Sequence, residues 1–308
     1  MTSPDYLSFH PNPKQPDHAL PPQSCDSHCH VFGPGTVFPY AASSSYIPVD
    51  APKEKLFALH HLLGVERAVI VQASCHDTDN RALVNALREG GSRYKGIAIV
   101  DDHISDSELT ELDEAGVGGV RFNFVKRLGG GKPLSVYRSI LAKIKPLGWH
   151  VVVYFDSEDL EELAPFLREI LVPVVIDHMG RVPVEEGTNS RAFGLVHDLL
   201  VSDEKFWIKI SCAERLSKQG PPYTDVDPVA RALLEAVPER VLWGTDWPHP
   251  NMKSHMPNDG QLVDRILDLC DTETLRQQVL VENPARLYGW QRRSQIVTAS
   301  SNLRNKRN

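Results

Sequence analysis

The sequence predicts an α/β protein of the (β/α)8 TIM-barrel class, and three observations support this. Eight short runs rich in β-branched residues alternate with amphipathic segments along most of the 308-residue chain. The runs are almost continuously apolar, as expected of buried parallel strands covered by helices. Eight strand–helix units fill about 250 residues in a typical barrel, so the chain is long enough for one such domain.

The strands are predicted from runs that are apolar at first and end in polar residues. CDSHCHV opens the series, RAVIVQA and KGIAIVD follow, and GVGGVRFNF, HVVVYF, VPVVIDHM, FWIKIS and RVLWGTDW complete it. Runs of this length and composition are typical of buried strands. The predicted strands are residues 25–31, 67–73, 95–101, 116–124, 150–155, 172–179, 206–211 and 240–247.

The helices are predicted from the amphipathic segments that separate these runs. A final segment, residues 273–288, is expected to form a C-terminal helix that caps the barrel. The predicted covering helices are residues 53–63, 78–90, 105–115, 134–145, 157–170, 190–201, 226–237 and 259–270.

A doubly wound open sheet is the alternative fold. It would be favoured by a glycine-rich phosphate loop after the first strand, and the sequence has none there. GVGGV at 116–120 and GGG at 129–131 lack the GxGxxG spacing in a strand–turn–helix setting.

Both ends of the chain differ in composition from the barrel region. Residues 1–23 are rich in proline and predict an extended arm, and residues 24–290 form the predicted barrel. Residues 291–308 contain five basic residues and no acid, and they predict a disordered basic tail. The barrel region is therefore more acidic than the total charge of −7 indicates.

Composition excludes several classes of function. With 41% hydrophobic and 24% charged residues, the chain can form a soluble globular core. An acidic body is not expected to bind nucleic acid, and no apolar run is long enough for a membrane span. The five cysteines form no CxxC pair, and the N-terminus lacks a signal-peptide pattern. We therefore expect free thiols and a cytoplasmic location.

Polar residues gather where the predicted strands end. In a barrel all carboxyl ends of the strands meet at one face, where active sites lie. The polar strand-end residues are His28, His30, Ser74, Asp101, Arg121, Asn123, Tyr154, Asp177, His178, Ser211 and Asp246. Burying so many polar groups at one end is costly unless they are paired or functional. The sequence therefore predicts an active site at this face.

The predicted chemistry centres on three histidines and an aspartate. His28 and His30 are two residues apart on a strand, so both rings point to the same face. His178 and Asp246 join them from two later strands. This set could ligate zinc, or it could activate water and polarise a carbonyl without a metal. Asp246, which follows an apolar strand, is the candidate general base.

Four arginines predict the class of ligand. Arg121, Arg127, Arg181 and Arg215 lie at strand ends or in the loops just after them. Guanidinium groups bind carboxylates through paired hydrogen bonds, so several around one pocket indicate a small polyanion. The hydroxyl groups of Tyr46 and Tyr154 could add donors.

At this point the sequence resembles the amidohydrolase superfamily, and within it the lactonases that open pyrone dicarboxylates. The segments that carry the resemblance run from about residue 25 to 289 in the family's order. They are DSHCHVFGP, VIVQASCHDTDN, GVRFNFVKRL, GWHVVVYF, VIDHMGR, ERL, GPPY, VLWGTDWPHPNM and NPARLY.

The resemblance implies hydrolysis of a dianionic lactone, 2-pyrone-4,6-dicarboxylate, to 4-oxalomesaconate in the catabolism of lignin-derived aromatics. Asp246 would deprotonate water, and His28, His30 and His178 would polarise the lactone carbonyl. The substrate-binding residues that it implies are Tyr46, Ser74, Arg121, Arg127, Tyr154, Arg181, Arg215 and Asn251.

The resemblance also bears on cofactors. Many amidohydrolases hold divalent ions with strand ligands that are replaced here by Tyr154, Arg121 and Asn123. A binuclear site is therefore not expected, and no cofactor is required. The alternative is one divalent ion such as zinc on His28, His30, His178 and Asp246.

Three other functions are compatible with the same barrel fold. A 4-sulfomuconolactone hydrolase, dependent on a metal, would use the same arginines for a sulfonate. A nonoxidative decarboxylase would prefer more metal ligands and fewer arginines. A barrel that only binds aromatic acids would not need the water-activating Asp246 beside three histidines.

Overall fold

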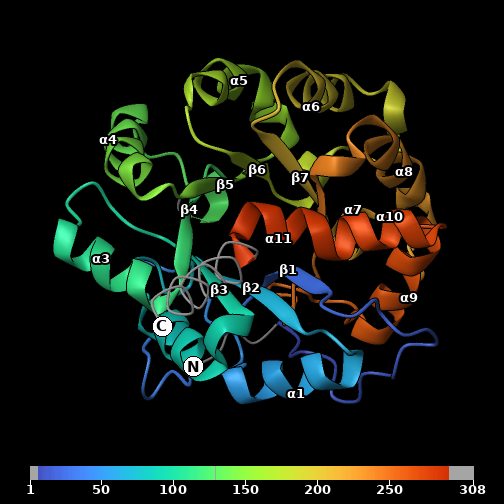
Figure 1. The fold of residues 1–308 in the computed structure, drawn as a ribbon, viewed down its shortest axis with the longest axis horizontal. Helices are drawn as coiled ribbons and strands as arrows, with labels where there is room; N and C mark the ends of the chain where they lie inside the picture. Colours follow the sequence, from blue (N-terminus) through green and yellow to red (C-terminus); the bar gives the residue numbers. More distant parts are fainter. Residues whose placement is uncertain (1–5, 129, 291–308) are drawn as a thin grey trace, which may run out of the picture.

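Eight parallel strands in the order β1 to β8 form the centre of the protein, and helices surround them (Figure 1). The computed structural model describes residues 6–128 and 130–290. The predicted barrel is therefore confirmed, and the open doubly wound sheet is not. The strands are β1 Cys25–Cys29, β2 Arg67–Val71, β3 Tyr94–Ala98, β4 Val117–Asn123, β5 His150–Tyr154, β6 Val174–Ile176, β7 Phe206–Ile210 and β8 Val241–Trp243.

Most helices follow the strands that they cover, as the alternation of the sequence predicts. Two helices beyond α9 continue the chain at the C-terminal end. The helices are α1 Lys53–Leu63, α2 Arg81–Gly90, α3 Asp106–Ala115, α4 Leu134–Ile144, α5 Leu160–Glu169, α6 Arg191–Ser202, α7 Ala213–Leu216, α8 Asp227–Ala236, α9 Asp259–Leu269, α10 Glu273–Gln277 and α11 Asn283–Tyr288.

The strands are shorter than predicted because the chain leaves the sheet early at the functional face. β6 ends at Ile176, and residues 178–181 form a tight turn with Met179 and Gly180 in left-handed conformations. At Gly180 a Cβ would lie 2.6 Å from a methyl carbon of Val196, so a side chain does not fit. The polar ends that the sequence assigned to strands 6 and 8 therefore belong to structured turns.

The predicted helix 273–288 is interrupted. A π-helical turn, Gln278–Glu282, separates α10 from α11. Pro284 lies in the first turn of α11 and has no N–H to donate to the carbonyl four residues earlier. The loss of this hydrogen bond accounts for the local change in helix geometry. The short helix α7, which directly follows β7, was not predicted.

β1 and β8 close the barrel through contacts at their ends. The His30 N–H donates to the Trp247 carbonyl, and the Asp246 N–H donates to the His28 carbonyl, both at 2.7 Å. Asp26 adds a side-chain link, since its carboxylate accepts from the backbone and hydroxyl of Thr245. A Cβ at Gly244 would lie 2.5 Å from the His28 nitrogen, so only glycine permits this approach. The seam places Asp246 beside His28 of β1 and His30, which directly follows this strand.

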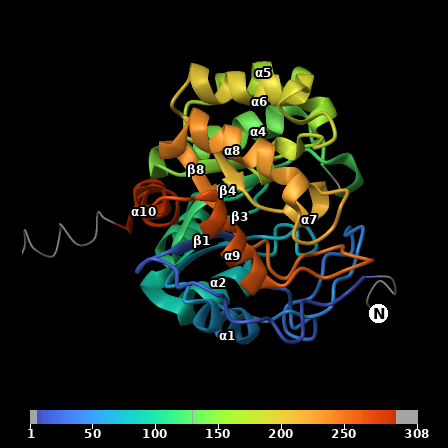
Figure 2. The same ribbon diagram turned by 90° about the vertical axis from the view of Figure 1, so that its right-hand side faces the viewer.

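Helix α11 lies across one end of the barrel, in front of the strands in Figure 1. Tyr288 of α11 packs with Cys25, Val69 and Val152 at the amino-terminal side of the strands. In the side view α10 and α7 lie at opposite ends of the molecule (Figure 2). The end with α7 is therefore left for the functional site.

The N-terminal arm packs against the loop that follows β8. Residues 6–23 contain neither helix nor strand. The Leu7 N–H donates to the Met252 carbonyl at 2.8 Å, and the Phe9 ring lies 5.2 Å from that of Trp247. The predicted basic tail, residues 291–308, lies outside the described residues.

All five cysteines are buried as free thiols. Burial raises the pKa of the Cys75 thiol to about 12, which disfavours the nucleophilic thiolate form. Among the described residues, no helix is long and apolar enough to cross a membrane.

Candidate active site

Asp246 lies at the centre of the predicted histidine cluster. Its Oδ1 atom is 3.2 Å from His30 Nε2, 3.4 Å from His28 Nε2 and 3.9 Å from His178 Nε2. All four side chains are buried. Strand spacing brings His28 and His30 to one face, and the β1–β8 seam brings Asp246 to them. The structure thus assembles the four residues that the sequence predicted to act together.

Asp246 is held as a carboxylate by the groups around it. Burial alone would raise its pKa, but Arg215, the hydrogen bond with His30 and the nearby His178 lower the pKa well below the usual value. Arg215 donates from Nη2 to Oδ2 at 2.8 Å. The other oxygen, Oδ1, faces the histidines. Asp246 is therefore ionised at neutral pH and has one oxygen directed toward the mouth of the barrel.

His30 has an acceptor at each ring nitrogen. Its Nδ1 lies 2.7 Å from the Val71 carbonyl oxygen, and its Nε2 lies 3.2 Å from the Asp246 carboxylate. These two contacts fix the orientation of the ring, and His30 in turn orients the Asp246 carboxylate.

Lys209 lies beneath the cluster, and sequence reasoning did not select it. Its side chain is fully buried on β7. Its Nζ lies 2.9 Å from His28 Nδ1 and 3.1 Å from Asp177 Oδ1. Asp177 also accepts from Arg121 at 3.1 Å, so one carboxylate lies between two cations. A single charged residue within the apolar run FWIKIS was the available signal.

Burial and this neighbourhood keep His28 and His178 uncharged. Burial lowers the pKa of His28 to about 3, with Lys209 opposing protonation and Asp177 favouring it. Burial likewise lowers the pKa of His178 well below its usual value. His178 Nδ1 lies 2.8 Å from the Ser211 hydroxyl. His28 Nε2 is buried and has no hydrogen-bond partner in the described structure.

The aromatic and basic residues of the mouth are placed around Tyr154. Arg181 donates to the Tyr154 hydroxyl at 2.7 Å and pairs with Asp156 at 3.1 Å. The guanidinium of Arg121 lies 4.8 Å from the Tyr154 ring centroid. Beside them is a cavity of about 150 Å³, whose lining includes Ser74, Arg121 and Asn123. This cavity offers hydroxyl, amide and guanidinium donors, and Arg121 belongs both to its lining and to the group around Tyr154.

The other predicted binding residues surround the same face. Burial raises the pKa of Tyr46 well above its usual value, and a hydrogen bond with Ser74 acts in the opposite direction. Asn251 has a buried amide oxygen without a partner in the described structure. Arg127 is exposed and has no ion pair with the described residues, unlike Arg121, Arg181 and Arg215.

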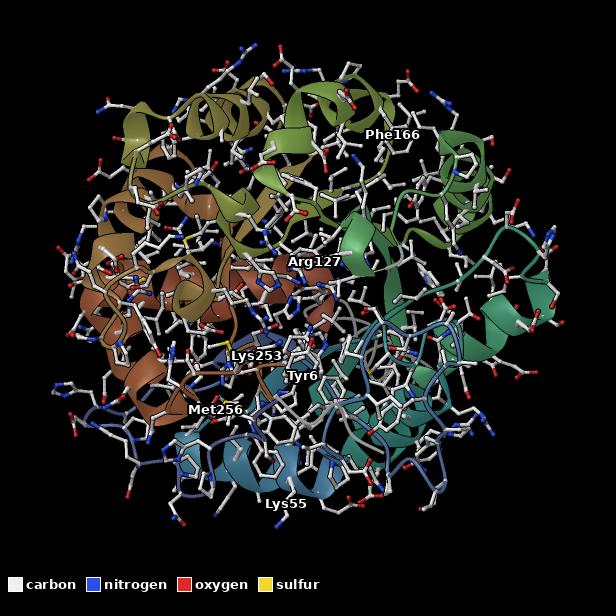
Figure 3. The ribbon with its side chains drawn as sticks, turned by 180° about the vertical axis from the view of Figure 1, so that it is seen from behind. Tyr6, Lys55, Arg127, Phe166, Lys253 and Met256 are labelled. Atoms are coloured by element: carbon white, nitrogen blue, oxygen red, sulfur yellow. The ribbon has the colours of Figure 1, made fainter. Side chains whose placement is uncertain are left out.

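Viewed from behind, Arg127 lies near the centre of the molecule, and Tyr6 and Lys253 appear together below it (Figure 3). The Lys253 ammonium is 5.1 Å from the Tyr6 ring centroid, and the Tyr6 ring packs edge-on against Tyr46 at 6.1 Å. The N-terminal arm therefore contributes to the wall of the mouth. No sequence pattern predicts the contact of Tyr6 with Tyr46 and Lys253.

The histidine cluster contains atoms that could in principle ligate a divalent cation. Ligand atoms of His28, His178 and Asp246 lie within 4.8 Å of one another. Both oxygens of Asp246 are already engaged, by Arg215 and His30. His28 Nδ1 lies 2.9 Å from the Lys209 ammonium, which can only donate, and a neutral ring that accepts this bond carries its proton on Nε2, the atom that would face a metal. In this arrangement the donor set does not fit a divalent cation.

The fold and the site define a class: a (β/α)8-barrel hydrolase with an ionised aspartate and three histidines at the carboxyl ends of its strands. The chain belongs to the amidohydrolase family, whose family model matches residues 25–290.

Two curated relatives are similar over most of their length. A 2-pyrone-4,6-dicarboxylate hydrolase of Comamonas testosteroni is 49% identical, covering 93% of this chain and 96% of the relative. A 4-sulfomuconolactone hydrolase of Hydrogenophaga intermedia is 37% identical, covering 88% and 90%. Both relatives are hydrolases of lactones.

A solved structure from Acinetobacter baumannii, assigned as a 2-pyrone-4,6-dicarboxylic acid hydrolase, holds citric acid. It is 27% identical with a TM-score of 0.75, and the match covers 87% of this chain and 99% of that one.

Proposed function

We propose that this protein hydrolyses 2-pyrone-4,6-dicarboxylate to 4-oxalomesaconate, opening the lactone ring in the catabolism of lignin-derived aromatics. The observation that carries the proposal is the ionised Asp246, buried within 3.9 Å of three histidine Nε2 atoms at a mouth rich in arginine. The identity of 49% with a hydrolase of this substrate supports the choice of lactone.

Asp246 acts as the general base in this proposal. Water placed against its Oδ1 attacks the lactone carbonyl carbon and gives up a proton to the carboxylate. The carbonyl oxygen becomes negative and accepts hydrogen bonds from His28 and His178. The carbonyl then reforms, the ring C–O bond breaks, and the enolate oxygen takes the proton. The products are a carboxylic acid, which ionises, and an enol that can convert to the ketone.

The arginines recognise the charges of the substrate. Arg127 is exposed at the mouth and is the one of the four predicted arginines that has no acidic partner among the described residues. Arg121 and Arg181 keep donors beside Tyr154 while each also pairs with an acid. We propose that Tyr46, Ser74 and Asn251 complete the contacts with the ring and its carboxylates. Arg215 serves mainly to orient Asp246.

The same site suits a second lactone. The relative that is 37% identical is a hydrolase of 4-sulfomuconolactone, and a sulfonate accepts guanidinium hydrogen bonds much as a carboxylate does. We favour the pyrone dicarboxylate because the more similar relative acts on it. We also propose that no metal is required, because the ligand atoms do not fit one.

Turnover of both lactones, followed by ultraviolet absorbance, tests the proposal. Pyrone dicarboxylate should be hydrolysed with the larger kcat/KM, and dialysis against a chelator should change kcat by less than about twofold. Loss of activity that zinc restores would overturn the metal-free mechanism. A preference for the sulfonated lactone would replace the proposed substrate but leave the site assignment in place.

A further inference from the structure

Lys209 is a buried charge, next to the histidine cluster, that the proposed mechanism does not use. It is fully buried on β7, between the apolar residues Ile208 and Ile210. Burial lowers its pKa, and Asp177 opposes this effect as the nearest negative charge. Keeping a charged amine in a protein interior is costly unless it has partners. Its two partners are Asp177, at 3.1 Å, and the ring of His28, at 2.9 Å.

The contact with His28 fixes the position of a proton. A lysine ammonium has only donors, so the His28 Nδ1 that faces it must present its lone pair. Burial lowers the pKa of His28 to about 3, so the ring carries one proton at neutral pH. That proton must be on Nε2. This atom is buried without a partner and lies 3.4 Å from Asp246 Oδ1, so it points to where substrate and water would bind.

We propose that Lys209 is a positioning residue that holds His28 in the Nε2–H tautomer. This tautomer makes His28 a hydrogen-bond donor to the lactone carbonyl oxygen, and it removes the lone pair that a metal ion would need. The catalytic part rests on the proposed function. The tautomer and the exclusion of metal rest on the contacts of Lys209 alone.

Asp177 competes with Lys209 for His28 Nδ1, and this competition shows why the lysine is needed to set the tautomer. Asp177 Oδ1 is only 3.1 Å from His28 Nδ1 and would accept a proton from it. Histidines that ligate metals usually donate their second N–H to such a carboxylate, which leaves the first nitrogen free to bind. With Lys209 in place, the lysine donates to His28 Nδ1 and forms an ion pair with Asp177. Without it, His28 Nδ1 becomes the nearest donor for Asp177.

Two variants separate this role from simple loss of a buried charge. Lys209→Met removes the donor and leaves Asp177 to draw the proton to Nδ1. Lys209→Met combined with Asp177→Asn removes both charges. Arg121 donates to Oδ2 of residue 177, so the amide oxygen should take that place and the amide nitrogen should face His28 Nδ1. The double variant should therefore restore the Nε2–H tautomer. Lys205→Met, at a lysine outside the site, is the matched control.

The measurements are nitrogen-15 NMR of the His28 ring, calorimetric titration with Zn²⁺ alone, and kcat with KM. We expect the Nε2–H tautomer in the parent chain, the double variant and the control, and the Nδ1–H tautomer in Lys209→Met. Zinc should bind to Lys209→Met at least about tenfold more tightly than to the other three. The kcat of Lys209→Met should fall on the order of 100-fold, as when one oxyanion donor is lost. The kcat of the double variant should be at least about tenfold higher than that of Lys209→Met.

An Nδ1–H tautomer in the parent chain would overturn the inference. An unchanged tautomer in Lys209→Met would do the same, as would a double variant no more active than the single one. If Lys209→Met does not fold, the double variant, in which Arg121 can still donate to the amide oxygen of residue 177, must keep the Nε2–H tautomer for the inference to stand. If the parent chain does not hydrolyse the pyrone, the NMR and zinc results still decide the role of Lys209.

Discussion

Two buried histidines near the mouth of the barrel differ in charge. His28 lies beside Lys209, and burial lowers its pKa to about 3. His249, in the loop after β8, lies 3.0 Å from Asp259 and 3.3 Å from Glu214. Burial alone would lower its pKa too, but the two carboxylates raise it to about 10. Equal burial therefore gives a neutral ring in one place and an imidazolium in the other.

The difference teaches that the neighbours of a buried histidine decide its task. A neutral ring can donate to a substrate carbonyl, and a lysine determines which nitrogen donates. A charged ring between two acids joins the loop after β8 to α7 and α9. We call Glu214, His249 and Asp259 the histidine clasp. The His249 N–H also donates to the Asp246 carbonyl at 2.7 Å, so the clasp supports the loop that carries the general base.

The largest expected effect tests the active cluster. Asp246→Asn keeps the shape of the side chain but removes the base, so kcat for pyrone dicarboxylate should fall about 1,000-fold. Stopped-assay and ultraviolet measurements give kcat, and calorimetry with a product analogue should still detect binding. The exposed Asp198→Asn is the control. A kcat near that of the parent chain would remove Asp246 from the role of base.

A smaller effect, on stability, tests the histidine clasp. Asparagine tolerates the positive φ of 57° at position 249, so His249→Asn should not strain the backbone. The substitution does leave two buried carboxylates without their cation. Unfolding free energy at pH 6 should fall by about 3 kcal/mol, measured with urea, while kcat at 25 °C falls less than about tenfold. The partly buried His197→Asn, at a histidine outside the clasp, should change neither.

The stabilisation by His249 should depend on pH, and the pKa values give the direction of the change. The folded-state pKa of His249 is raised to about 10, above an unfolded value of about 6.5. The stabilisation is therefore complete below pH 6.5 and is lost as the pH rises toward 10. The difference between the parent chain and His249→Asn should shrink between pH 6.5 and 9.5. A difference that grows over this range would contradict the charged clasp.

The smallest effect concerns an arginine outside both clusters. Arg127 is exposed and has no acidic partner in the described structure. Arg127→Met should raise KM for the dianionic substrate about tenfold with little change in kcat, because the contact is made equally to substrate and transition state. Steady-state kinetics measure this, and the exposed Arg168→Met is the control. An unchanged KM would exclude Arg127 from substrate binding.

The sequence alone shows that strands alternate with helices and that polar residues lie at the strand ends. These patterns predicted the barrel and the four residues of the cluster, because residues at the carboxyl ends of parallel strands must meet at one face. The prediction of strand lengths was less accurate. His178 and Asp246 lie in left-handed turns, which local apolar composition does not indicate.

The ion-pair partners of the charged residues could not be predicted from the sequence. The four arginines looked alike in the sequence, yet Arg121 pairs with Asp177 and Arg215 with Asp246, while Arg127 remains exposed. Lys209 was one charged residue in an apolar run until folding placed it against His28.

The sequence by itself determined the barrel, the face that carries the site and the residue types gathered there, because periodicity along the chain is a local property. The tertiary structure alone decided which of these groups are charged and which way each proton points. Those properties depend on burial and on contacts within a few ångströms, across seams such as β1–β8, between residues as distant in the chain as His28 and Lys209.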